Sequence, residues 1–70
     1  MVNTDKLVGL IYEKGLTKQA FAEKLGKKSS WLSRKLKKKN FTIAEADSAV
    51  NILGLTSAEA TAIFFSQFVA

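Results

Sequence analysis

The chain of 70 residues suffices for one small domain, because a chain this short buries only about 60% of the surface that its unfolded form exposes. It contains no cysteine and no histidine, which excludes a disulfide framework, a thiolate metal site and the commonest metal ligand. Its 11 Lys and Arg residues, all within residues 1–44, outnumber 6 Asp and Glu residues to give a net charge of +5, so we expect a polyanionic partner.

Two helices are predicted in the first part of the chain. The first is capped by Asn3 or Thr4 and ends at Gly15. The second is short, is capped by Thr17 and ends at Gly26. Their inward-facing apolar positions are Leu7, Leu10 and Ile11 in the first helix and Phe21, Ala22 and Leu25 in the second.

A third helix is predicted to begin near residues 28–30 and to turn Leu32 and Leu36 inward at i, i+4. Ser30, Arg34 and Lys37 then lie on its outer side, which is basic and hydroxylic. Eight Lys and Arg residues separate Glu23 from Glu45 with no acidic residue among them, so we expect all eight to be unpaired.

Two capping boxes mark the last two predicted helices, which begin at Thr42 with Glu45 and at Thr56 with Glu59. Their inward positions are Ile43, Ala46, Val50 and Leu53 in the fourth helix and Ala60, Ile63, Phe64 and Phe68 in the fifth. No segment has the alternating pattern of a strand. We therefore predict an all-α fold of five short helices, with residues 1–70 forming a single domain.

The second and third helices together read "TKQAFAEKLGKKSSWLSRKLK", in which a small Ala22 allows a close helix crossing and Gly26 allows a tight turn. This spacing predicts a helix-turn-helix. With "GLTKQAFAEKLG", "SSWLSRKL", "FTIAEAD" and "ILGLTSAEATAIFF" in this order, nearly the whole chain resembles the phage Cro and lambda-type repressor family, and especially its small Cro-like members.

The resemblance implies a lambda-repressor-like bundle whose third helix enters the major groove of double-stranded DNA. The positions that would face the bases are Lys28, Ser29, Ser30, Ser33 and Arg34. The positions that would meet phosphates are Thr17, Lys18, Lys27, Lys37, Lys38 and Lys39. For Arg34 a bidentate contact to guanine stays open beside two alternatives, a phosphate contact and a solvated side chain.

Three lysines depart from the family's pattern. Lys27 replaces an apolar turn residue, and Lys28 replaces the usual hydroxyl cap, so we expect the cap of the third helix to shift to Ser29. Lys38 replaces a common glycine, so the turn there needs another geometry or a residue in the left-handed region.

Trp31 lies at the border between the inward and outward sides of the third helix. We expect its ring to cover the flank of that helix against neighbouring helices, with a DNA contact as the alternative. Near the end of the chain, Phe65, Phe68 and Val69 form either a partner interface or, for Phe65, an incidental exposure beside the core.

The leading functional hypothesis is a phage Cro-like transcriptional regulator that binds operator DNA as a monomer or weak homodimer in the cytoplasm of a bacterial host. The alternative is a modulator that complexes with a partner phage repressor protein. An enzyme is not expected, because groups for acid-base, nucleophilic or metal chemistry are missing. No cofactor, metal or membrane association is expected, since no apolar run approaches the length of a bilayer span.

Overall fold

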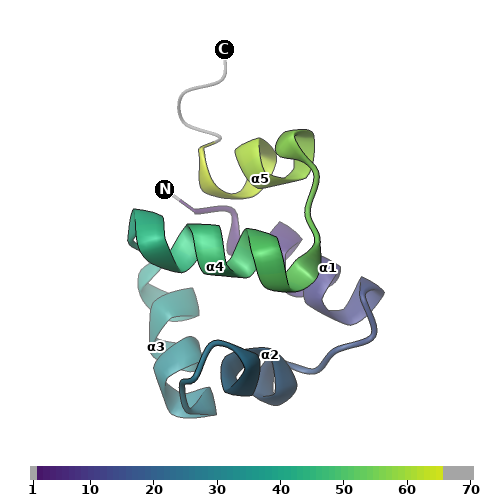
Figure 1. The fold of residues 1–70 in the computed structure, drawn as a ribbon. Helices are drawn as coiled ribbons and strands as arrows, with labels where there is room; N and C mark the ends of the chain where they lie inside the picture. The colour runs from purple at the N-terminus through teal and green to yellow at the C-terminus, as the bar shows by residue number, and fades with distance from the viewer. Residues whose placement is uncertain (1, 66–70) are drawn as a thin grey trace.

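A computed structural model describes residues 2–65 of the chain, and this range contains five α-helices and no strand. They are α1 (Thr4–Glu13), α2 (Lys18–Lys24), α3 (Ser29–Lys38), α4 (Ile43–Leu53) and α5 (Ser57–Phe64). In Figure 1, α4 crosses the middle of the molecule between α5 and α2, while α1 and α3 lie on opposite sides. The prediction of an all-α fold built from five short helices is confirmed.

The helix starts follow the predicted caps. Asn3 caps α1 by accepting a hydrogen bond from the Lys6 amide, and Thr17 caps α2 by accepting one from the Ala20 amide. The capping boxes at the starts of α4 and α5 are both complete. In each box the threonine hydroxyl accepts from the glutamate amide, and the glutamate carboxylate accepts from the threonine amide.

The two ends of α3 differ from expectation. The predicted cap at Ser29 is wrong, because Ser29 is the first helical residue and Lys28 occupies the cap position without a side-chain hydrogen bond. At the other end Lys38 remains helical, and Lys39 adopts the left-handed conformation with φ 56° and ψ 35°. The left-handed residue therefore lies one position later than the place where the resemblance puts glycine.

The core draws on all five helices. Its largest fully buried side chains are Leu7, Ile11, Phe21, Leu32 and Ile63. Ala22 and Ala49 are also fully buried, which lets neighbouring helices approach closely. Ala49, Val2 and Leu55 belong to this core although the sequence pattern did not single them out.

The prediction that Ile43 faces inward is wrong, because 80% of this residue is exposed. Ile43 is the first residue of α4, one turn before Ala46, which is the first buried side chain of that helix. Periodicity places Ile43 on the side of Ala46, but α4 begins beyond the edge of the core. The buried side of α4 consists of Ala46, Ala49 and Leu53.

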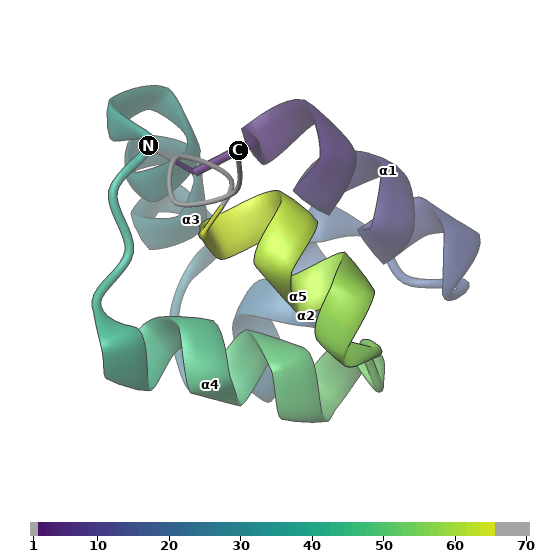
Figure 2. The ribbon, with the colours of Figure 1, turned by 90° about the horizontal axis from the view of Figure 1, so that it is seen from above.

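The first residues of the chain connect two distant elements. The Val2 amide donates to the carbonyl of Lys39 at 3.3 Å, and the Asn3 amide donates to the carbonyl of Ile63 at 2.7 Å. The start of the chain therefore lies between the end of α3 and the end of α5. Seen from above in Figure 2, α5 lies over the space between α1 and α4, and its last turn points towards the side of α3.

Candidate nucleic-acid interface

The candidate interface is built on α2, α3 and the turn of residues 25–28 between them. Gly26 lies in the left-handed region with φ 74°, and the Lys27 amide donates to the Ala22 carbonyl at 2.9 Å, so the chain reverses within a few residues. Phe21 and Leu32 are buried in the common core, and α3 packs more extensively on α2 than any other pair of helices does. This packing fixes the rotation of α3 about its axis.

That rotation gives α3 one buried and one exposed side. Leu32 is buried and Leu36 is half-buried. The remaining exposed positions form what we call the outer face of α3: Ser29, Ser30, Ser33, Arg34, Lys37 and Lys38. At about 100° per residue, Ser30 and Lys37 lie near its centre, with Ser33 on one side of them and Arg34 on the other.

All the residues predicted to contact DNA are exposed, six of them on the outer face of α3 and five outside it. Ser29, Ser30, Ser33, Arg34, Lys37 and Lys38 share the outer face of α3. Lys27 and Lys28 precede it in the turn, Lys39 follows it, and Thr17 and Lys18 lie at the start of α2. The hydroxyl of Thr17 already accepts the Ala20 amide, so its capping role is filled within the chain.

The expectation that eight cations lack acidic partners is wrong for Lys35. Its Nζ lies 3.0 Å from Oε1 of Glu45, and both side chains are mostly buried. Within residues 2–65 this is the one ion pair. Glu45 was visible in the sequence as a capping residue, but the approach of α4 to α3 that pairs it with Lys35 has no local signal.

Glu45 is held in its charged form. Partial burial alone would raise the pKa of its carboxyl group, but hydrogen bonds from the Thr42 amide and from Lys35, together with the Lys35 charge, outweigh burial and lower that pKa. The Lys35 charge is therefore neutralised locally, while the outer face of α3 keeps its positive charge.

Trp31 is half-buried at the edge of α3. Its ring meets the ring of Phe41 edge-on at a centroid distance of 6.4 Å, and Phe41 meets Phe64 of α5 at 5.8 Å. The Nζ atoms of Lys27 and Lys35 lie 5.6 and 5.8 Å from the indole centroid. Trp31 thus packs along the flank of α3, as the first of its two predicted roles requires.

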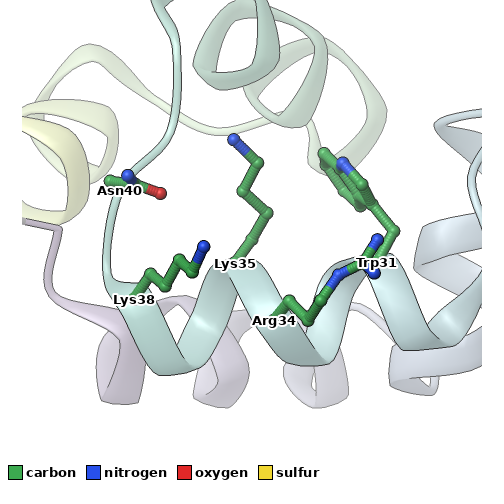
Figure 3. Close-up of a pocket in the computed structure, with 5 residues that line it drawn as sticks. All are labelled: Trp31, Arg34, Lys35, Lys38 and Asn40. Carbon is green, nitrogen blue, oxygen red and sulfur yellow. The ribbon is translucent and has the colours of Figure 1, made fainter.

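A shallow hollow of about 200 Å³ opens beside Trp31. Figure 3 shows its lining: Trp31 and Lys35 rise from the same side of α3, while Lys38 and Asn40 turn towards Lys35. Arg34 is the fifth lining residue. Sequence reasoning missed Asn40, because its side chain reaches the hollow only through the left-handed turn at Lys39.

The predicted partner interface is described only in part. Phe65 is 40% exposed. The other two predicted residues, Phe68 and Val69, lie outside the described residues. Tyr12 and Ile43 are further exposed apolar side chains, but neither was predicted to form an interface.

In the part of the chain that the structure describes, no three acidic side chains gather in a group that could hold a metal ion. None of the helices in that part is both long and apolar enough to cross a membrane. Comparisons of the chain with protein-family models, curated proteins and solved structures give no match.

Proposed function

We propose that this chain is a DNA-binding transcriptional regulator in which α2 and α3 act as a helix-turn-helix and α3 enters the major groove. The observation that carries this proposal is the outer face of α3, which is exposed, hydroxylic and basic on a helix fixed by its packing on α2. A major groove about 12 Å wide admits such a helix, and serine hydroxyls and cationic side chains suit base edges and phosphates.

Charge supports a nucleic-acid partner over a neutral one. Lys37 and Lys38 lie on the outer face, and Lys39 follows it. None of these three has an acidic partner among residues 2–65. A polyanion would relieve the mutual repulsion of these lysines. Lysines that neutralise DNA phosphates also release condensed counterions, which supplies most of the affinity for DNA.

The resemblance to small phage Cro-like regulators makes operator DNA in a bacterial cell the proposed target. On this proposal the lambda-repressor-like arrangement positions Ser30 and Ser33 towards bases. Lys18 and the start of α2 meet the backbone of the duplex. Ser29 and Lys28 enter the groove at the N-terminal end of α3.

The test begins by selecting a preferred duplex from a random pool with the wild-type chain and measuring its affinity beside a random duplex. The double variant Ser30→Ala, Ser33→Ala should bind the selected duplex about 5- to 150-fold more weakly, because each lost hydrogen bond is worth roughly 0.5–1.5 kcal/mol. Affinity for the random duplex should be unchanged. Equal losses on both duplexes, or no preferred duplex at all, would contradict base reading by α3.

The alternative function, a modulator that complexes with a partner phage repressor, draws on the exposed Phe65. Exposed aromatic side chains are enriched at protein interfaces. Phe65→Ser should abolish a complex with the repressor while leaving duplex affinity unchanged. Duplex binding by the isolated wild-type chain, with no complex at micromolar repressor, would favour direct DNA binding instead.

A further inference from the structure

We infer that the hollow beside Trp31 is the seat of one backbone phosphate of duplex DNA, and that Arg34 clamps this phosphate instead of reading a base. The inference deepens the proposed function and rests on it. It starts from the five residues that line the hollow, Trp31, Arg34, Lys35, Lys38 and Asn40. Three of them are cationic and one carries an amide, so the lining is rich in hydrogen-bond donors.

The charges around the hollow are unequal. Lys35 is neutralised by Glu45 at 3.0 Å, whereas Arg34 and Lys38 have no acidic partner within residues 2–65. The hollow therefore keeps about two uncompensated positive charges in a volume of about 200 Å³. A phosphodiester is the anion in DNA that accepts several hydrogen bonds from a guanidinium and an ammonium together.

The position of Arg34 on α3 favours the same role. Ser30 and Lys37 lie near the centre of the outer face, while Ser33 and Arg34 lie on its two opposite sides, Arg34 on the side that bears Trp31 and the hollow. When a helix lies in the major groove, the middle of its exposed face meets base edges, and the two sides of that face meet the phosphate backbones. Arg34 is therefore placed to meet the backbone.

The hollow is also preformed. Edge-on contact with Phe41 fixes the Trp31 ring as one wall, and the ammonium groups of Lys27 and Lys35 lie over that ring. The left-handed Lys39 turns the chain so that Asn40 lines the opposite part. The carbonyl of Lys39 accepts the Val2 amide, which holds this turn in place. A seat with fixed walls loses little conformational freedom on binding.

The experiment measures affinity for the selected and random duplexes across a range of salt concentrations. Arg34→Ala should weaken binding about tenfold on both duplexes alike, whereas base reading by Arg34 predicts a loss on the selected duplex alone. Arg34→Lys should restore binding to within about threefold on both, because an ammonium also binds a phosphate but cannot form the bidentate guanine contact.

The double variant Arg34→Ala, Lys38→Ala shows whether the two residues share one phosphate. A shared phosphate lowers the slope of log K against log salt by about 0.9, and two separate phosphates lower it by about 1.8.

The control Lys14→Ala removes one exposed charge near Glu59, at the end of α1 far from α3, and should leave the slope nearly unchanged. Both α3 positions are exposed and alanine favours helix, so the variants should fold, which circular dichroism checks.

Trp31 is the one tryptophan of the chain, so its fluorescence reports on the hollow directly. Duplex should change this fluorescence in the wild type and much less in the double variant. Inorganic phosphate at the same phosphate concentration should not, and a full response to inorganic phosphate would overturn the assignment to DNA. If the wild type binds duplex while the Arg34→Ala and Arg34→Ala, Lys38→Ala variants have the duplex affinity and salt slope of Lys14→Ala, the phosphate site is wrong but the proposed function stands. If the wild type binds no duplex, the proposed function itself fails.

Discussion

At the scale of single residues, Glu45 performs two tasks with one carboxylate. Its Oε1 accepts the Thr42 amide at 2.8 Å to complete the capping box and also lies 3.0 Å from Nζ of Lys35. The equivalent residue of α5, Glu59, accepts the Thr56 amide at 2.9 Å. The two glutamates therefore form a natural pair in which the cap is the same and the ion pair differs.

This pair predicts a gain in DNA affinity. Glutamine at either position keeps the cap, because its side-chain oxygen also accepts the threonine amide. Glu45→Gln should release Lys35 and raise duplex affinity about two- to fivefold at low salt, while lowering the free energy of unfolding by about 0.2–1 kcal/mol. Duplex titration and denaturant unfolding measure the two effects.

Glu59→Gln is the matched control, since it makes the same charge change in a carboxylate that has no ion pair within 4 Å among residues 2–65. It should change duplex affinity less than Glu45→Gln does. Equal gains for the two variants would mean that net charge alone acts and that Lys35 is not restrained by Glu45.

At the scale of helices and turns, the sequence predicted local features and missed those made by tertiary contacts. Thr42 and Thr56 were identified as caps because a capping box is complete within four residues. Ile43 was assigned to the core because periodicity says which side of a helix a residue occupies, but not where the core under that helix ends. The pairing of Lys35 with Glu45 and the hollow beside Trp31 both depend on how α4 follows α3.

The connection between α3 and α4 carries the one non-glycine residue with positive φ in the described chain, Lys39. Lys39→Gly should raise the free energy of unfolding by about 0.5–1 kcal/mol, because a side chain in the left-handed conformation costs roughly 1–2 kcal/mol and the added freedom of glycine offsets part of the gain. Thermal unfolding should show a melting temperature higher by several degrees.

Lys38→Gly provides the opposite case with the same change of charge. Lys38 is helical, so glycine there should lower the free energy of unfolding by up to about 1 kcal/mol. If both glycine variants destabilise the protein, the left-handed residue is not at position 39 in solution. If Lys38→Gly instead raises the free energy of unfolding, the left-handed residue lies at position 38, where the resemblance suggests glycine.

At the scale of the whole molecule, charge is divided between a basic part around α2 and α3 and an acidic part in α4 and α5. The principal dimensions are 34, 23 and 20 Å. Two copies placed end to end along the 34 Å dimension would thus fit half-sites about 34–36 Å apart, the spacing of one turn of DNA. A joining surface at Phe65, Phe68 and Val69 stays a prediction, and Phe65 is the residue of this surface that the structure describes.

The two capping glutamates also set the response of the whole fold to acid. Hydrogen bonding from the Thr56 amide lowers the pKa of Glu59, and nearby Lys14 and Lys6 lower it further, while Thr42 and Lys35 lower the pKa of Glu45 against the effect of burial. A carboxyl group with a lowered pKa in the folded state stabilises that state above its ordinary pKa of 4.5. This contribution is lost as the pH falls through the lowered value.

The double variant Glu45→Gln, Glu59→Gln should therefore show a flatter fall in the free energy of unfolding below pH 4.5 than the wild type. Urea unfolding at a series of pH values measures this difference. An unchanged acid dependence would contradict the role of these two glutamates.

The backbone hydrogen bond between Asn3 and Ile63 has a consequence for folding during synthesis on the ribosome. Residues made near the start of synthesis wait for the fifth helix before their backbone groups are satisfied. At the usual rate of translation, the intervening sixty residues take roughly 3 to 12 seconds to add. During that interval the core that Leu7, Ile11 and Phe21 share with Ile63 is incomplete, so a nascent chain stalled before α5 exposes apolar surface that chaperones bind.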